Sequence, residues 1–373
     1  MTWLEQWLAT KADALRARDL TRTLRVRETD DAIVDLAGND YLGLAHDPRV
    51  IDAAVAATRT WGTGATASRL VSGTTRLHAD LERALANQMG MPAALVFSSG
   101  YLANLGIVSA LGGPDCLIVT DAHVHASLVD ATRLARSPVV EVPHNDCDAV
   151  ADALARRTQP RAVVLTESVF SVLGDAAPLH DLSKVCAEGG AVLVVDEAHG
   201  LGVVGSGHGA VHEAGLAGEP HVVATATLSK ALASQGGAIV GSQALVDHLV
   251  NRARSFIFDT ALAPGAAGAA LAALGIVRSE ARYEAVLTRI AQFASVCGVA
   301  TPAGAVLSVP MSSARDALDA AATCLKAGIR VAAFRPPSVP DGVSRLRITA
   351  RATLSDAEVA RACEVLATVC GPA

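Results

Sequence analysis

The sequence predicts an α/β fold whose core is a mainly parallel β-sheet. Its 373 residues, 51% of them hydrophobic, are enough to bury a large core. From about residue 47 to residue 241, helical stretches alternate with short, almost wholly apolar runs at 94–97, 116–119, 162–165, 191–195 and 222–224. Strands that are apolar on both faces belong to sheets that helices cover on both sides. These runs therefore indicate a buried sheet between helical layers.

The last apolar run of this region, residues 238–240, is expected to break the parallel order. It follows Lys230 too closely for a crossover helix of about a dozen residues. We therefore expect it to run antiparallel to the preceding strand, which makes the sheet mixed.

The chain is predicted to have three parts. Residues 1–45 form an N-terminal helix and arm, because Leu4, Leu8 and Leu15 recur at helical spacing before a short extended piece. Residues 46–260 form a large α/β domain. Residues 261–373 begin with an Ala-rich helix and continue with strand and helix patterns, which predicts a smaller α+β domain.

The composition argues against several classes of protein. The net charge is −6 and no dense run of Lys or Arg exists, so binding to nucleic acid or to a membrane surface has no electrostatic support. Apolar stretches such as 191–195 and 118–119 are far below the roughly 20 residues that cross a bilayer, and the N-terminus does not read as a signal peptide, so we expect a cytosolic protein. The seven cysteines are scattered without a C-x-x-C, which favours reduced thiols over disulfides or zinc.

Lys230 is the first candidate for a catalytic residue. The chain has only four lysines, and Lys11, Lys184 and Lys326 lie in predicted helices where a surface position is expected. Lys230 instead follows an apolar strand and precedes the small residues 234–237. A lysine kept from water at a strand end has its neutral amine favoured, as imine chemistry requires. The alternative is a lysine that only caps the edge of the sheet.

Asp196 and His199 follow the apolar run at 191–195 and are expected at the carboxyl end of a strand, where open α/β sheets bind ligands. An aspartate there can pair with a protonated pyridine nitrogen. At about 4 Å and an effective dielectric near 20, such a contact contributes roughly 4 kcal/mol before desolvation. Residues 196–199 also resemble a Walker-B box, but the chain has no G-x-x-x-x-G-K-[ST] loop, which disfavours nucleotide hydrolysis.

Polar groups follow three other predicted strands. Ser99-Gly100-Tyr101 precedes a helical stretch, so its N–H groups are placed to meet a phosphate, although an ordinary helix start has the same pattern. His123 and His125 follow another strand, and no carboxylate or thiol cluster completes a metal site around them. Ser171 follows the run at 162–165. Five strand ends thus direct polar groups toward one crevice.

In this order the motifs resemble those of the α-oxoamine synthases, which depend on pyridoxal 5′-phosphate (PLP). The resemblance covers nearly the whole chain and implies the aspartate-aminotransferase-like fold, PLP fold type I, with a seven-stranded sheet. Segments 335–340 and 345–347 are similar to those of family members that condense L-alanine with a pimeloyl thioester. The shared motifs are Asn39-Asp40-Tyr41-Leu42-Gly43, Ser68-Arg69 with Gly73, Ser99-Gly100-Tyr101 with Asn104, His125-Ala126-Ser127, Asp196-Glu197-Ala198-His199-Gly200 and Ser229-Lys230.

The resemblance implies a role for each candidate site residue. Lys230 would be the Schiff-base lysine, and Asp196 would pair with the pyridine nitrogen. His199 would contact the ring oxygen, His125 would stack on the ring, and Arg347 would hold the amino-acid carboxylate. The other implied contacts are those of Gly100, Tyr101, Ser171 and Thr227 with the cofactor, of Thr260 with the phosphate of a neighbouring subunit, and of Arg22, Asn39 and Ser338 with the substrate.

Two positions depart from the family pattern. Ser338 stands where a threonine is expected and keeps the hydroxyl, and Asp259 stands where a small hydroxyl residue is common. The resemblance further implies a homodimer with active sites at the subunit interface and a decarboxylating condensation. The amino acid would displace Lys230, lose its Cα proton and attack the thioester, and CO₂ would leave. Whether coenzyme A or acyl carrier protein carries the acyl group stays open.

Two other functions fit part of the same pattern. Sister enzymes condense glycine with acetyl or succinyl thioesters, as 2-amino-3-ketobutyrate ligase and 5-aminolevulinate synthase do, and their catalytic residues would look alike. A non-catalytic PLP-fold subunit or regulator is the third possibility. The presence of Lys230 and the short N-terminal arm argue against that third class.

Overall fold

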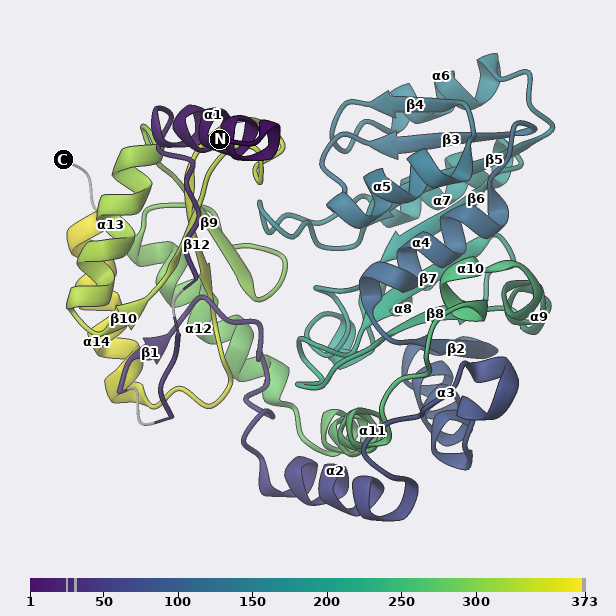
Figure 1. Cartoon of the computed structure of the whole chain (residues 1–373), viewed down its shortest axis with the longest axis horizontal. Helices are drawn as coiled ribbons and strands as arrows, with labels where there is room; N and C mark the ends of the chain where they lie inside the picture. Colours follow the sequence, from purple (N-terminus) through teal and green to yellow (C-terminus); the bar gives the residue numbers. More distant parts are fainter. Residues whose placement is uncertain (25, 30–31, 371–373) are drawn as a thin grey trace.

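The computed structural model describes residues 1–24, 26–29 and 32–370. A seven-stranded sheet forms the core of its larger part, on the right in Figure 1. The strand order is β2-β8-β7-β6-β5-β3-β4. The strands are β2 (Ala93–Phe97), β3 (Cys116–Asp121), β4 (Val139–Val142), β5 (Arg161–Glu167), β6 (Val192–Asp196), β7 (Val222–Thr227) and β8 (Gly237–Gly241). The predicted fold class is confirmed.

Only β8 runs against the others. The pairs β4-β3, β3-β5, β5-β6 and β6-β7 are parallel, whereas β8 is antiparallel to both β7 and β2. The short connection after Lys230 enforces this direction, as the sequence predicts, because a parallel return needs a long crossover.

Both faces of the sheet are buried because alternate side chains enter different cores. On β6, Val194 lies in one core while Leu193 and Val195 lie in the other. The first core lies against α4 (Gly100–Leu111), α5 (Ala126–Ala135), α9 (Gln243–Arg252) and α10 (Arg254–Ile257). The second lies against α3 (Arg76–Met89), α6 (Cys147–Arg156), α7 (Leu179–Glu188), α8 (Ala210–Glu213) and α11 (Pro264–Ser279). The period of two along each strand produces this division.

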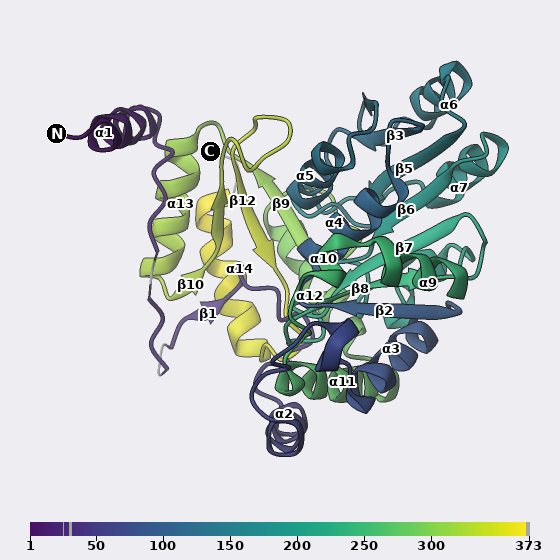
Figure 2. The same ribbon diagram turned by 45° about the vertical axis from the view of Figure 1, so that its right-hand side comes forward.

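A second, smaller group of elements packs beside this sheet, as the rotated view in Figure 2 shows. Its antiparallel sheet has the order β11-β12-β9, and β1 of the N-terminal arm pairs in parallel with β10. The strands are β1 (Val34–Asp35), β9 (Val306–Pro310), β10 (Ile329–Arg330), β11 (Ala332–Phe334) and β12 (Arg345–Thr349), and the helices are α12 (Arg282–Val296), α13 (Ala314–Lys326) and α14 (Asp356–Cys370).

The remaining helices connect or flank the two groups. Helix α11 packs closely on α2 below the large sheet in Figure 1, where Gly268 lies so near α2 that an added Cβ would be 2.6 Å from that of Ala57. Helix α1 buries none of its residues. Among the described residues, no helix is both long enough and apolar enough to span a bilayer. These elements are α1 (Trp3–Arg16), α2 (Pro48–Trp61), and the short turns η1 (Arg69–Gly73) and η2 (Gly205–Gly207).

Candidate active site

The strand ends predicted from the sequence do meet in one place. A cavity of about 270 Å³ at the carboxyl ends of β5, β6 and β7 is lined by seven of the predicted residues, namely Gly100, Tyr101, His125, Asp196, His199, Thr227 and Lys230. A second pocket of about 630 Å³ is lined by Asn39, His125, Ser171, His199, Lys230, Ser338 and Arg347, together with other residues. His125, His199 and Lys230 line both spaces, so the cavity and the pocket adjoin.

Asp196 is fixed at the end of β6 by neutral donors. The side-chain amide of Asn104 donates to Oδ2 of Asp196 (2.7 Å) and to the Ser127 hydroxyl (2.8 Å), and the backbone N–H of Ala198 donates to Oδ1 (2.9 Å). Thr225 in turn donates to the Asn104 carbonyl oxygen (2.7 Å). Asp196 is therefore held in one orientation and has no basic side chain among these partners, so its charge stays available to a cationic group in the cavity.

A chain of hydrogen bonds runs from Lys230 into the protein. Nζ of Lys230 lies 2.9 Å from Nε2 of His199, and Nδ1 of His199 lies 2.7 Å from the Tyr41 hydroxyl. The hydroxyl donates to the side-chain oxygen of Asn39 at 3.0 Å, so it accepts from Nδ1–H, and Nε2 of His199 is left as the acceptor for the lysine. Burial, with Lys230 nearby, lowers the pKa of His199 well below its ordinary value, which agrees with a neutral ring.

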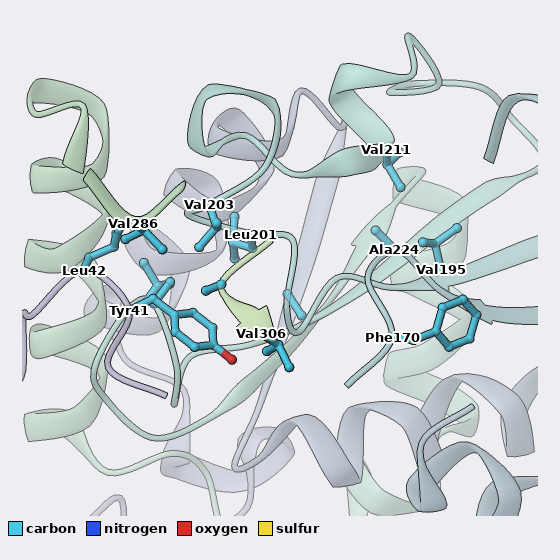
Figure 3. Packing of buried hydrophobic residues seen from close by; sticks show 14 of the residues in the cluster. Tyr41, Leu42, Phe170, Val195, Leu201, Val203, Val211, Ala224, Val286 and Val306 are labelled. Atoms are coloured by element: carbon cyan, nitrogen blue, oxygen red, sulfur yellow. The ribbon is translucent and has the colours of Figure 1, made fainter. Parts of the chain in front are cut away.

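Tyr41 is a site residue that was not among the predicted ones. Its ring belongs to the buried apolar cluster, with Leu42 and Val286 nearby, and its hydroxyl stands at the outer end of the ring (Figure 3). Burial raises the pKa of Tyr41 to about 12, although Arg347 opposes this shift. The phenol therefore keeps its proton and anchors His199.

Lys230 itself lies on a closed hairpin between β7 and β8. The N–H of Leu228 donates to the carbonyl of Gly236 (3.0 Å), Ser234 donates back to Leu228 (2.9 Å), and Ala233 donates to the carbonyl of Lys230 (2.8 Å). Removal from water lowers the pKa of the Lys230 amine to about 8, although the nearby carboxyls of Asp196 and Glu167 oppose this shift. A large fraction of the amine is therefore neutral at slightly alkaline pH.

Glu167 is a second carboxyl at a strand end, and it was not among the predicted site residues. It pairs with Asp196 in the register of β5 and β6, and one of its oxygens accepts the N–H of Ser171 at 3.0 Å. Burial and the charge of Asp196 raise the pKa of Glu167 to about 8. Its other oxygen, Oε1, is buried without a partner and belongs to a residue that lines the cavity. A ligand group in the cavity would satisfy it.

The N-terminus of α4 also lines the cavity. Ser99 caps the helix by accepting the N–H of Leu102 (3.1 Å), and Gly100 and Tyr101 begin it at the cavity. A Cβ at Gly100 would lie only 3.1 Å from Cβ of Thr227, so a side chain would close this space. Backbone N–H groups at a helix start, with threonine and serine hydroxyls beside them, suit a phosphate.

His125 stands where the cavity opens into the pocket. It caps α5, and its Nδ1 accepts the backbone N–H of Ser127 at 3.2 Å. Burial lowers the pKa of His125, so the ring is neutral and its proton lies on Nε2. This nitrogen can donate to a ligand.

The pocket contains the arginine that the resemblance assigned to a carboxylate. Arg347 is almost fully buried, and its Nε donates to the carbonyl of Ser171 (2.8 Å) while both terminal nitrogens lie 3.3 Å from the Asn39 side-chain oxygen. Its guanidinium stacks over Phe334. None of these partners is an anion, so the charge of Arg347 is available to a carboxylate ligand.

Two candidate residues, Arg22 and Thr260, line neither the cavity nor the pocket in a single chain. Arg22 is exposed, but it donates to the hydroxyl of Ser338 (2.8 Å), which lines the pocket, so it reaches the rim. Thr260 is exposed, makes an isolated bridge with Ser68, and is not among the described residues that line the cavity or the pocket. Asp259, beside it, accepts the hydroxyl of Ser98 in the same chain.

Comparison with known families supports the class of protein that this geometry suggests. The family model described as aminotransferase class I and II matches residues 31–366, which is most of the chain. Among solved structures, serine palmitoyltransferase from S. paucimobilis, solved with bound PLP, has a TM-score of 0.91 at 26% identity and covers 99% of this chain and 98% of its own. The chain belongs to the class I and II aminotransferase family, as the resemblance predicted.

Within that family, the similar curated relatives have one name in common. The 8-amino-7-oxononanoate synthases of Mycolicibacterium gilvum and Mycolicibacterium smegmatis are each 57% identical over 366 residues, covering 97% of this chain and 96% of theirs. The solved 8-amino-7-oxononanoate synthase of Francisella tularensis has a TM-score of 0.78 at 26% identity, covering 91% of this chain and 98% of its own. The predicted kinship with this group of synthases is confirmed.

Proposed function

We propose that this chain is a PLP-dependent acyltransferase that joins L-alanine to a pimeloyl thioester. The residues present fit the cofactor. Asp196 offers an uncompensated carboxylate for the pyridine nitrogen, the start of α4 offers N–H groups for the phosphate, and Glu167 has an unpaired buried oxygen at the cavity. When bound, PLP supplies an electron sink that stabilises negative charge at the α-carbon of an amino acid.

The observation that carries this proposal is the position of Lys230. Its amine, with a pKa lowered to about 8, lies at the junction between the cavity and the pocket. From there it can bond to the cofactor and, once displaced by the amino acid, accept the Cα proton. The neutral His199, held by Tyr41, accepts a hydrogen bond from the amine and so directs it.

The acyl thioester, the second substrate, binds in the pocket beside L-alanine. Arg347 binds the carboxylate of L-alanine, while Nε2–H of His125 donates to the carbonyl of the acyl thioester. A C–C bond forms between the α-carbon and this carbonyl carbon, and the C–S bond breaks to release the carrier thiol. The carboxylate of alanine then leaves as CO₂, and a proton returns to the same carbon. The product is 8-amino-7-oxononanoate, an intermediate of biotin biosynthesis.

We also propose that two copies complete each site. The segment around Thr260 exposes apolar side chains of Leu70, Val71 and Phe258, which are 51%, 80% and 70% exposed. If these surfaces pair, Thr260 of one copy comes to the phosphate site of the other. Sedimentation at micromolar concentration should give a dimer, and the variant Val71→Asp should give monomers that bind PLP weakly. A monomeric wild-type protein with full activity would contradict this arrangement.

Reaction assays test the substrates. Purified protein with PLP should show a visible absorbance band that borohydride removes, and L-alanine with pimeloyl thioester should yield CO₂ and the nine-carbon product. Pimeloyl-coenzyme A and pimeloyl-acyl carrier protein, compared at equal concentration, identify the carrier. Turnover only with glycine and short acyl thioesters would move the assignment to a sister enzyme. A protein that takes up no PLP would refute the cofactor itself.

We assign the reaction to the cytoplasm, where biosynthetic thioesters are made.

A further inference from the structure

A group of titratable side chains adjoins the pocket and has no role in the reaction described above. We call Asp121, His123, His144 and Asp175 the His144 cluster. Nδ1 of His144 lies 3.0 Å from Oδ1 of Asp121, and Nε2 lies 2.8 Å from Oδ2 of Asp175. The ring of His123, which lines the pocket, stacks on that of His144 with centroids 4.0 Å apart. One imidazole therefore joins two carboxylates that belong to different segments.

His144 is protonated in this setting. Burial lowers its pKa, but the hydrogen bonds and charges of Asp121 and Asp175 overcome burial and raise the pKa to about 9. Burial and the charge of His144 lower the pKa of His123, so the stacked partner is neutral. Below pH 9, both nitrogens of His144 donate, and both hydrogen bonds are charge-assisted.

The cluster is connected to the substrate pocket through one loop. We call residues 168–176 the Ser171 loop, and Asp175 stands near its end. The N–H of Phe170 donates to the carbonyl of Asp175 (2.9 Å), and the ring of Phe170 packs edge-on against that of His144 at 4.4 Å. Between them, the carbonyl of Ser171 accepts Nε of Arg347. The position of this carbonyl therefore sets the orientation of the guanidinium.

Other contacts also hold the loop: the N–H of Ser171 donates to Glu167 (3.0 Å), and the N–H of Ser168 donates to the carbonyl of Asp196 (2.9 Å). Gly174 packs so tightly on β9 that an added Cβ would lie 2.1 Å from the carbonyl oxygen of Val306, and Ala303 donates to the Gly174 carbonyl (2.9 Å). Asn145, next to His144, donates to the same oxygen of Asp175 at 3.1 Å. The His144 cluster thus holds the Asp175 end of the loop on the side of the large sheet, while Gly174 packs against the small one.

We propose that His144 is a positioning residue for the substrate carboxylate, because its hydrogen bond to Asp175 holds the Ser171 loop and, through Ser171, Arg347. This inference rests on the proposed function, in which Arg347 binds the carboxylate of L-alanine. It predicts an effect on the affinity for the amino acid and little effect on the acyl thioester or on the proton transfer at Lys230.

Two substitutions of His144 by amides of different length distinguish the positioning role from a general structural role. In His144→Gln the amide nitrogen reaches the place of Nε2 and keeps the bond to Asp175. In His144→Asn the shorter amide reaches only the place of Nδ1 and keeps the bond to Asp121. His144→Asn should raise the KM for L-alanine about tenfold, the size of one lost charge-assisted hydrogen bond, while kcat and the KM for the thioester stay within about twofold. His144→Gln should stay within about threefold of the wild type in all three.

Binding of L-alanine to the PLP-loaded protein without thioester, followed by absorbance, provides a readout without turnover. The affinity should fall in His144→Asn and Asp175→Asn by similar factors, and the double variant should lose no more than either single one. His208→Asn is the matched control, since His208 also stacks on a histidine (His212, 4.5 Å) but contacts Gln88 outside the site. Melting temperatures show which variants fold.

The possible outcomes are distinct. Equal alanine affinity in folded His144→Asn and His144→Gln proteins would overturn the inference, as would a uniform loss of kcat with unchanged KM. Additive losses in the double variant would also overturn it. A wild-type protein that binds PLP but not L-alanine would instead refute the proposed function and this inference with it.

Discussion

The cavity and the pocket are neighbours, but they are built in different ways. The cavity of about 270 Å³ is lined entirely by residues between Ser99 and Lys230, and Asn104 of α4 links Asp196 on β6 to Thr225 on β7 by hydrogen bonds. The pocket of about 630 Å³ combines Asn39 from the N-terminal arm, residues of the large sheet, and Phe334, Ser338 and Arg347 from the C-terminal part. The residues proposed for the chemical step are thus positioned by one sheet and its helices. Substrate recognition instead depends on how three parts of the chain meet.

This difference predicts that variants in the cavity lower kcat and that variants in the pocket raise KM. The largest effect is expected for Lys230→Ala. It removes the only amine among the described residues that line either space, so turnover should fall by at least about a thousandfold, because covalent attachment and proton transfer are both lost. The visible band should also lose its sensitivity to borohydride. Substantial residual synthesis in a folded variant would contradict the role of Lys230.

Asp196→Asn is the next test of the cavity. The amide has the same shape but removes the charge that pairs with the pyridine nitrogen, so kcat should fall about a hundredfold to a thousandfold. The KM for L-alanine should change little. The comparison is kcat at saturating PLP against that of Asn104→Ala, which only loosens Asp196 and should lose less. A change of kcat below about tenfold in Asp196→Asn would show that its charge is not used.

Arg347→Lys tests the pocket. Lysine keeps the charge but cannot hold Ser171, Asn39 and a carboxylate together, so the KM for L-alanine should rise about tenfold to a hundredfold. The KM for the thioester should change much less. Steady-state kinetics with each substrate varied in turn give both values. A fall in kcat alone would show that Arg347 acts in the chemical step. It would contradict the prediction that pocket variants change KM.

Glu167→Gln sharpens the comparison through pH. The Glu167 carboxylate raises the pKa of Lys230, so its removal should lower that pKa and move the rising limb of the kcat–pH profile to lower pH. The pH dependence of stability provides a second test of the same variant. The folded-state pKa of Glu167, about 8, is above its unfolded value, so wild-type stability is lost as pH rises toward 8, and the glutamine variant should lack this loss. Glu197→Gln, a buried carboxyl whose oxygens are already taken by Ser168 and Val211, is the control for the kcat profile. An unshifted profile in Glu167→Gln would exclude the coupling.

The smallest effect is expected for Ser338→Thr. The family pattern has threonine here, and its hydroxyl can still accept from Arg22, as serine does at 2.8 Å. The KM for the acyl thioester should therefore stay within about twofold. A larger change would mean that the extra methyl group alters the shape of the acyl channel.

The sequence predicted the cavity better than the pocket for a physical reason. Lys230 and Asp196 end apolar runs, and parallel strands bring such ends together whatever the loops do. The roles of Tyr41 and His144 depend on contacts between distant segments, which a local pattern does not contain. Strand β4 also escaped notice, because its first three residues are exposed at the sheet edge and form no wholly apolar run. Glu167 was visible at its strand end, but only its unpaired oxygen and its neighbour Asp196 give it meaning.

The hairpin that carries Lys230 has a kinetic consequence. Because backbone hydrogen bonds close residues 228–236, the lysine has a fixed base, and its amine moves only by rotation of its own side chain. In the proposed reaction, the amine that the substrate displaces therefore stays beside the cavity. Its recapture is intramolecular, at an effective concentration far above that of any free amine in the cell. The hairpin closed by β8 thus lets the Lys230 amine return to the cofactor site after each turnover without a diffusive encounter.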